Sequence, residues 1–174
     1  MLPHASSQIR AMIELQGLTG MRPGEILILR PGDMTMDEVW KYRPESHKME
    51  HHGKERIIFL GEKAQAILRP WLDRHSESYC FQPAQSDRSK NRSANAGKPY
   101  RRDSYTLAIR RACKKAGISP WSPNQLRHTH ATLVREQFGL EADQVVLGHS
   151  RADVNQVYAE RNHKLAAEVQ KLIG

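Results

Sequence analysis

The segment that decides the fold begins Pro123-Asn124-Gln125-Leu126-Arg127-His128-Thr129-His130-Ala131-Thr132. A proline suits the first position of a helix, and the sequence stays compatible with a helix as far as Phe138. At about 100° per residue, Asn124, Arg127 and His128 share one arc of this helix. Leu126 and Leu133 fall almost opposite that arc. We therefore expect a helix that is anchored by its apolar face and presents Arg127 from its polar face.

Two roles for Arg127 are open at this point. Its planar guanidinium carries several donors in a fixed fork, which suits a phosphate group. An isolated arginine more often binds the carbonyls of a helix C-terminus or an acidic neighbour. The rest of the sequence is needed to choose between these two roles for Arg127.

The chain before this segment predicts two helices and a small sheet. Helical spacing runs from Ser6 to Leu18, and after the glycines of a tight turn Pro23 opens a second, short helix that stops before Pro31. The turn between the two helices presents Arg22. Three short strands are then expected at residues 34–35, 39–42 and 56–60. Residues 43–55, between the second and third strands, are too polar to be core.

The rest of the chain reads as helices. They are expected at residues 64–72, 105–116, 124–138, 141–147, 151–160 and 164–173, with breaks at Gly139, Gly148 and Asn162 and a flexible basic segment at 82–99. We find no internal repeat and no linker that would divide the chain. The predicted fold class is α+β, mainly α, with one three-stranded antiparallel sheet in a single domain.

The positive charge is concentrated in one window. The 174 residues carry a formal net charge of +8. Residues 85–115 hold ten bases and two acids, whereas the remainder holds 17 of each. A local excess of this kind indicates a surface for a polyanion, although a solvated charged face is the alternative. The candidate DNA-binding residues are Lys54, Arg88, Lys90, Arg92, Lys98, Arg101 and Arg102.

Composition argues against several other classes of protein. Cys80 and Cys113 stand 33 residues apart, so neither a thiolate zinc site nor a redox pair is indicated, and a reducing, cytoplasmic setting fits best. The longest apolar runs are four residues long, too short to cross a membrane, and the start lacks a secretion signal. No acid or cysteine shares a ligand-like spacing with His47, His51 and His52 or with His128 and His130, so we expect no metal and no cofactor.

Four motifs, taken in order, resemble those of the tyrosine recombinases, the phage integrase family. The family's TG-x-R-x-x-E box is matched by residues 19–25, its H-x-L-R-H-T-x-A-T box by residues 124–132, and its LGH[SR] box by residues 147–150. Tyr158 follows His149 by nine residues, the spacing that the family uses. One box alone is a weak signal, whereas all of them in this order, with the sheet between the first two, are highly specific.

The resemblance implies a reaction and a role for each residue. Members of the family cut a DNA strand by attack of a tyrosine on the phosphodiester, without metal or ATP. Tyr158 carries over as the nucleophile, Arg22 and Arg127 as the cations that stabilise the transition state, and His149 as a donor to the phosphate. The hairpin lysine, a general acid in the family, carries over to Lys48, with Lys54 as the alternative. Glu25 is expected to brace the turn around Arg22.

One residue departs from the family pattern. Asn124 stands where the second box usually opens with histidine. Asparagine can hydrogen-bond a phosphate oxygen or orient Tyr158, but it cannot exchange a proton near neutral pH. Proton transfer then passes to Lys48, His128 or water, or activity is reduced. The candidate catalytic set is Arg22, Lys48, Asn124, Arg127, His149 and Tyr158.

The resemblance also implies partners. Residues 1–174 are expected to form a tyrosine recombinase catalytic domain without the family's N-terminal core-DNA-binding domain, and therefore to bind double-stranded DNA weakly. On DNA, a synaptic tetramer is expected, in which the stripe of Leu165, Val169 and Leu172 packs on a neighbouring subunit. The sequence leaves open whether the isolated domain is a monomer. Two alternatives are open: strand relaxation like that of a type IB topoisomerase, and a non-catalytic DNA-binding module.

Overall fold

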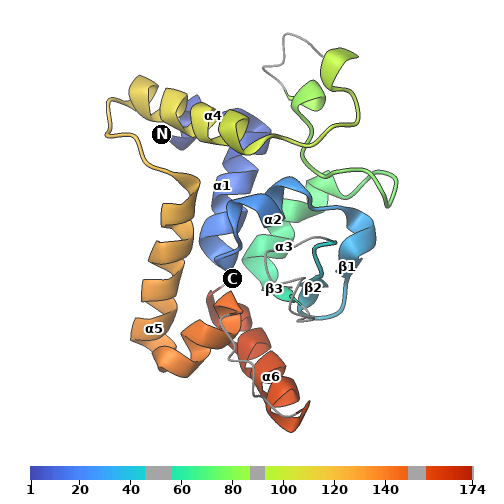
Figure 1. Ribbon diagram of the computed structural model, residues 1–174, viewed down its shortest axis with the longest axis vertical. Helices are drawn as coiled ribbons and strands as arrows, with labels where there is room; N and C mark the ends of the chain where they lie inside the picture. Colours follow the sequence, from blue (N-terminus) through green and yellow to red (C-terminus); the bar gives the residue numbers. More distant parts are fainter. Residues whose placement is uncertain (46–55, 87–92, 149–155, 174) are drawn as a thin grey trace.

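The computed structural model describes residues 1–45, 56–86, 93–148 and 156–173, and of residues 156–162 only the helical backbone. The fold is mainly helical with a small three-stranded antiparallel sheet, as predicted (Figure 1). The helices are α1 (Ser7–Thr19), α2 (Pro23–Leu27), α3 (Glu62–Leu68), α4 (Arg102–Ala116), α5 (Pro123–Leu147) and α6 (Gln156–Ile173). The strands are β1 (Met34–Thr35), β2 (Trp40–Tyr42) and β3 (Ile58–Leu60).

The sheet separates two apolar clusters. Its order is β1-β2-β3, with both pairs antiparallel and Trp40 opposite Leu60. All three side chains of β3 are buried, and successive residues of a strand point to opposite faces. Ile58 and Leu60 accordingly join the main core, whereas Phe59 joins a smaller cluster beneath α5 and α6. The strand therefore connects the main body of the domain to its last helix.

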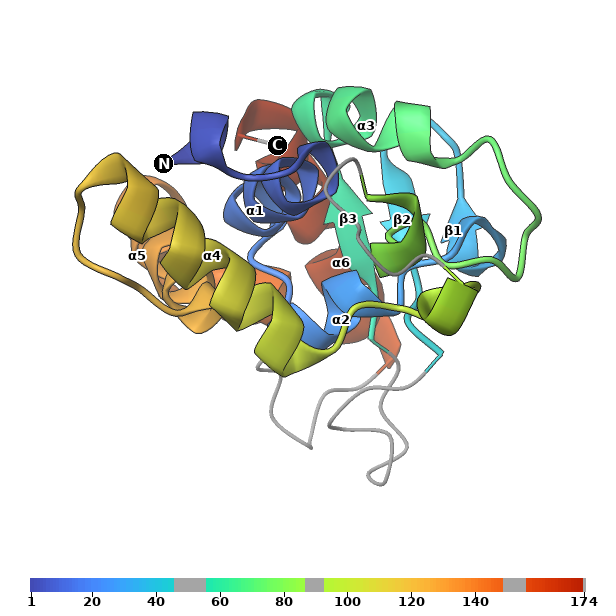
Figure 2. The same ribbon diagram turned by 90° about the horizontal axis from the view of Figure 1, so that it is seen from above.

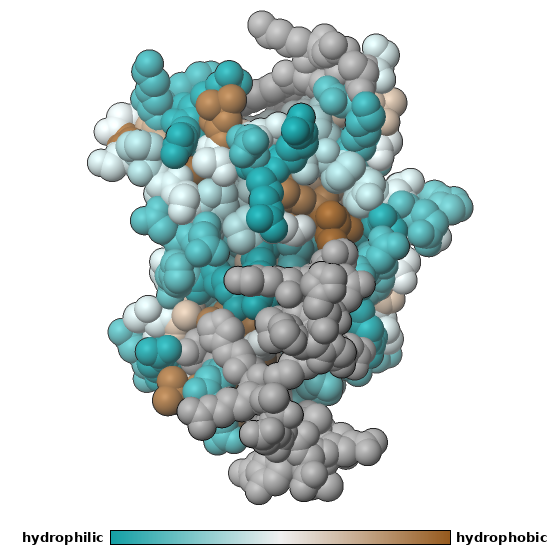
Figure 3. Space-filling model, in the orientation of Figure 1, coloured by the Kyte–Doolittle hydropathy of each residue, from teal (hydrophilic) through white to brown (hydrophobic). Residues whose placement is uncertain are grey.

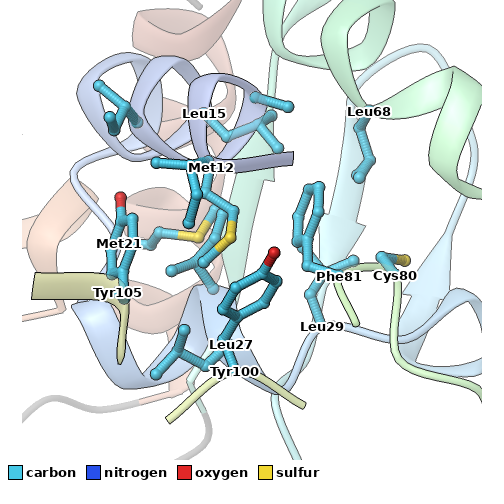
Figure 4. Packing of buried hydrophobic residues seen from close by; sticks show 14 of the residues in the cluster. Met12, Leu15, Met21, Leu27, Leu29, Leu68, Cys80, Phe81, Tyr100 and Tyr105 are labelled. Carbon is cyan, nitrogen blue, oxygen red and sulfur yellow. The ribbon is translucent and has the colours of Figure 1, made fainter. Parts of the chain in front are cut away.

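The main core is built around α1, which runs through the middle of the molecule (Figures 1 and 2). The Ser6 hydroxyl caps its start, and Gly20, in the left-handed conformation at φ 64°, ends it. Met12 and Leu15 of α1 pack against side chains from the α2, α3 and α4 regions (Figure 4). The Tyr105 hydroxyl of α4 donates to Gln16 Oε1 over 3.1 Å, so a satisfied polar pair also crosses this core.

The predicted orientation of α5 is wrong for Arg127 and Leu133, although Leu126 packs against the main core as expected. Arg127 and His130 are only 6% and 2% exposed and share the buried face with Val134, whereas Leu133, expected in the core, is 41% exposed. The first half of α5 packs on the C-terminal end of α1, where carbonyl groups need hydrogen-bond donors. Donor-bearing side chains are therefore the ones that face inward. The expected break at Gly139 is present as a kink with φ 85° and ψ 176°.

The C-terminal helix differs from its prediction in its extent, and part of its apolar stripe packs inside the domain. α6 continues through Asn162, since neither glycine nor proline stands there to stop it. It packs within its own chain against β3 and α5, burying Ala166 and Val169, while Leu172 stays 69% exposed. Val169 of the predicted stripe is thus buried inside the domain and Leu165 partly so, whereas the packing of the stripe on a neighbouring subunit stays a prediction. Neither α6 nor another helix in the described ranges is long and apolar enough to span a membrane.

Candidate functional site

An open cleft of about 1120 Å³ lies where α2 and the first turns of α4 and α5 meet. It brings together three of the predicted catalytic residues from segments that are distant in the chain: Arg22, Asn124 and Arg127. Arg102, one of the predicted DNA-binding residues, lines the same cleft. Its remaining lining consists of Pro23, Gly24, Glu25, Leu27, Ile28, Tyr100, Thr106, Ser122 and Pro123.

Arg22 is held by the carboxylate three residues after it. It is the N-cap of α2, where its backbone N–H donates to Glu25 Oε2 over 2.6 Å. Its Nη1 donates to Glu25 Oε1 over 2.9 Å, and its side chain remains 23% exposed. The prediction that Glu25 braces the turn is thus confirmed. A guanidinium so held keeps donors available for the cleft.

Behind Arg22 lies a buried ion pair that sequence reasoning missed. Arg56 Nε is 3.3 Å from Glu25 Oε1, and Arg56 Nη1 donates to the Val146 carbonyl over 3.2 Å. Burial alone would raise the pKa of Glu25, but the charge of Arg56 and the hydrogen bonds from Arg22 outweigh it and lower that pKa. Burial lowers the pKa of Arg56, against the opposing effect of Glu25. A signal was present in the sequence, because Arg56 directly precedes the apolar run at 57–60.

Arg127 joins the ends of two helices. Its Nη1 donates to the carbonyl of Gly20, the C-cap of α1, over 2.7 Å. Its Nη2 donates to the carbonyl of Leu147, the last residue of α5, over 2.8 Å. Each of these bonds uses one terminal nitrogen of the guanidinium. Arg127 therefore binds helix-end carbonyls, as an isolated arginine commonly does, and it also lines the cleft.

His130 is a second buried polar residue that sequence reasoning did not place here. Its Nδ1 donates to the carbonyl of Gly17 over 3.0 Å, and its Nε2 lies 3.3 Å from Gln170 Nε2 on α6, in the tautomer that satisfies both contacts. The ring therefore ties α1, α5 and α6 together behind Arg127. Its sequence signal was helical spacing from Arg127 to His130 and Val134, which marks one face.

Asn124 reaches the cleft from the first turn of α5. Its Nδ2 lies 3.1 Å from His128 Nε2, and both residues are exposed. In the tautomer that accepts this bond, His128 carries its proton on Nδ1. A titratable ring thus stands one turn behind the asparagine that replaces the family's usual histidine.

Several predicted site residues lie outside the described residues. They are Lys48, Lys54, Arg88, Lys90, Arg92 and His149, together with His47, His51 and His52. Tyr158 lies in the first turn of α6, and its side chain is likewise outside the described part. The roles assigned to these residues therefore stay predictions.

The remaining predicted DNA-binding residues are on the surface. Lys98, Arg101 and Arg102 are exposed in the approach to α4 and at its start. On the face seen in Figure 3, hydrophilic residues predominate and apolar ones form small separate patches. Figure 2 places the start of α4 beside α2, so this basic segment adjoins the cleft.

Fold and cleft together define a mainly helical domain with arginines gathered from three segments. Residues 3–164 match the sequence profile of the phage integrase family, and the chain belongs to that family. A relative named tyrosine recombinase XerC, from Corynebacterium glutamicum, is 31% identical over 159 residues, which are 91% of this chain and 48% of that protein. A XerC of Actinobacillus pleuropneumoniae is 31% identical over 95% of this chain and 52% of its own length.

Solved structures show the same fold. The integrase of mycobacterium phage Brujita matches with a TM-score of 0.66 at 19% identity, over 97% of this chain and 52% of that one. The XerH site-specific recombinase bound to its difH substrate, in a pre-cleavage complex, matches with a TM-score of 0.60 at 19% identity, over 90% of this chain and 46% of that one. The chain spans about half the length of the curated relatives it matches.

Proposed function

We propose that this domain cuts and rejoins DNA strands as part of a site-specific tyrosine recombinase. The observation that carries the proposal is the convergence of Arg22, Asn124 and Arg127 on one open cleft. Two fixed guanidiniums suit the dianionic character that a phosphodiester acquires when an oxyanion attacks it. Membership of the phage integrase family and the resemblance to XerC proteins support the same reaction.

The proposed step is a transesterification in which the tyrosine replaces deoxyribose on phosphorus. The phenolic oxygen of Tyr158 forms a bond to phosphorus and releases its proton to a base or water. The bond to the 5′-oxygen breaks, and that oxygen takes a proton from Lys48, or from Lys54 if that lysine occupies the site. A 3′-phosphotyrosyl bond and a free 5′-hydroxyl result, so the reverse step with a new 5′-hydroxyl needs neither ATP nor a metal.

The two arginines would differ in how they stabilise this step. Arg127 is fixed by two carbonyl oxygens, so its charge is not neutralised by those partners. Arg22 is fixed by Glu25, which partly offsets its charge but aligns its donors. Losing one well-placed donor of this kind typically costs about 10²–10³ in rate. His149 would add a third donor, and Asn124 a neutral one.

The test is a covalent-adduct assay with a selected substrate. A library of nicked duplexes with random flanks is incubated with the protein, and DNA that stays attached through denaturing detergent is recovered and sequenced. We expect an enriched site and an adduct that Tyr158→Phe abolishes while leaving DNA binding intact. The proposal fails if the wild-type protein forms no adduct with any member of the library.

The same substrates separate the alternatives. Relaxation of a supercoiled plasmid without strand exchange between two selected sites would support chemistry like that of a type IB topoisomerase. DNA binding without any adduct would support a non-catalytic module. Under the main proposal, exchange requires several subunits, and we expect crosslinking on two selected sites to yield a tetramer.

A further inference from the structure

We propose that Arg102 is a third phosphate-binding cation of the cleft and contacts the cut strand at a phosphate next to the scissile one. The inference rests on the proposed function for the identity of the strand. Nothing in the family motifs assigns this residue, because Arg102 lies in none of the matched boxes. What places it is its contact with α2.

The side chain of Arg102 lies against a glycine beside Arg22. A Cβ atom built on Gly24 would be 2.9 Å from Arg102 Nη2, 3.5 Å from Nε and 3.6 Å from Cζ. Three guanidinium atoms at such short range mean that the group rests on the bare backbone of α2. Although Arg102 belongs to α4, its charged end is thus seated on the turn that presents Arg22.

Arg102 differs from its two neighbours in what it binds. Arg22 is paired with a carboxylate, and Arg127 donates to two carbonyls. Within the described residues, no hydrogen bond or ion pair occupies the Arg102 guanidinium, and the residue is exposed. A planar group with five donors, seated on backbone and facing an open cleft, is available for a phosphate oxygen.

The spacing of the cations selects a neighbouring phosphate. Arg22 and Gly24 are two residues apart, so their Cα atoms are separated by roughly 7 Å at most. Successive phosphates of one strand advance by about 3.4 Å along the duplex axis. A cation on Gly24 is therefore in range of a phosphate one or two nucleotides from the one that Arg22 would bind.

A hydroxyl extends the same subsite. Thr106 is four residues after Arg102 on α4, so the two side chains lie on the same face of the helix, and both line the cleft. The Thr106 hydroxyl can donate to a phosphate that Arg102 has neutralised. Such contacts fix the position of the protein along the strand and do not read the base sequence.

The first experiment measures the salt dependence of DNA binding. Fluorescence anisotropy of a labelled 40-base-pair duplex is recorded from about 50 to 200 mM salt, the range over which phosphate contacts are resolved. Arg102→Ala is expected to reduce the slope of log K against log salt by about 0.9, the value for one lost phosphate contact. Arg10→Ala, which removes an exposed arginine of α1 outside the cleft, is the control and should leave the slope unchanged.

The second experiment locates the contact. Single phosphates around the selected cleavage site are replaced by neutral methylphosphonates, and binding of wild type and Arg102→Ala is compared on each duplex. The difference between the two proteins should vanish when the phosphate one or two nucleotides from the scissile one is neutral. A slope equal to that of wild type, or coupling only to a more distant phosphate, would overturn the inference.

A variant that keeps the charge of Arg102 tests the contact between its guanidinium and the backbone at Gly24. Gly24→Ala places a Cβ 2.9 Å from Nη2 and must displace the guanidinium. We expect it to reproduce part of the Arg102→Ala effect and to add nothing in the double variant, as required of two changes to one contact. Additive effects would contradict the seat. If wild type forms no adduct, the proposed function fails, whereas the salt slope still decides whether Arg102 binds a phosphate.

Discussion

The two sides of the cleft hold their arginines by different means. On the α2 side, Arg22 is bound by Glu25, and Glu25 is bound in turn by the buried Arg56. On the α5 side, Arg127 is bound by the backbone carbonyls of Gly20 and Leu147. The first arrangement is a chain of charges that stays partly exposed at its outer end. The second is a buried clasp between two helix ends.

Because the two arginines are held differently, we expect their removal to affect stability to different extents. Removing Arg127 takes away the donors for two carbonyls at buried helix ends, so the domain itself should weaken. Removing Arg22 leaves Glu25 still paired with Arg56 and still accepting the backbone N–H at position 22. We therefore expect the same type of side chain, on the same cleft, to contribute strongly to stability on the α5 side and little on the α2 side.

Arg127→Ala is expected to have the largest effect. It should lower the free energy of unfolding by about 3 to 5 kcal/mol, since two hydrogen bonds from a charged donor are lost from buried carbonyls. It should also slow adduct formation by about 10²–10³. Urea denaturation and the adduct assay measure the two effects. A variant as stable as wild type would show that the carbonyl clasp contributes little.

Arg22→Ala should affect rate alone. We expect adduct formation to slow by about 10²–10³, while the free energy of unfolding changes by less than about 1 kcal/mol, because the side chain is partly exposed and its ion pair is screened. The same two assays apply. Comparable destabilisation by Arg22→Ala and Arg127→Ala would remove the distinction between the two sides.

The pH dependence of the stability of Glu25→Gln should test the chain of charges formed by Arg22, Glu25 and Arg56. Glutamine can still accept from the backbone at Arg22, but Arg56 loses its counter-charge, so we expect a loss of about 3 kcal/mol of unfolding free energy at neutral pH. The pKa of Glu25 is lowered in the folded state from 4.5, so its stabilisation is complete above that value and is lost as the pH falls through the lower folded pKa. Denaturation at pH 7 and at pH 3 should therefore give a gap from wild type that narrows in acid. A gap that is independent of pH would contradict the charge chain.

Asn124→His should have the smallest effect and acts on the chemistry only. A histidine beside the cleft introduces a group that titrates near pH 6.5. We expect adduct formation to change by no more than about tenfold and to acquire a new limb in its pH profile near that value. Rates measured from pH 5.5 to 8.5 provide the check, and an unchanged profile would mean that position 124 takes no part in proton transfer.

Local signals predicted the elements of this fold well. Ser6, Pro23 and Pro123 mark helix starts, and Gly20, Gly139 and Gly148 mark helix ends or a kink, because capping and backbone conformation depend on a few neighbouring residues. The three strands were found from short apolar runs. The break at Asn162 was wrong because asparagine weakens a helix only slightly.

Sequence reasoning failed where tertiary contacts reverse the usual preference for burial. Hydrophobic periodicity assigned Leu133 to the core and Arg127 to the surface, but the neighbour of α5 is the end of a helix, which needs donors rather than methyl groups. Sequence reasoning also missed Arg56, because its burial depends on contacts with Glu25 and the Val146 carbonyl, which are distant in the chain. Arg22, Asn124 and Arg127, which motif resemblance assigned to one catalytic site, line one cleft, but the resemblance did not indicate what holds them, and their catalytic role stays a prediction.

The absence of a side chain at Gly20 lets α5 pack closely against the end of α1. A Cβ there would lie 2.5 Å from His130 Cδ2 and 2.8 Å from Leu147 Cδ2, so both halves of α5 close over this one residue. Any side chain at Gly20 would therefore push α5 away from the end of α1 and break the hydrogen bond by which Arg127 joins the two helices beside the cleft.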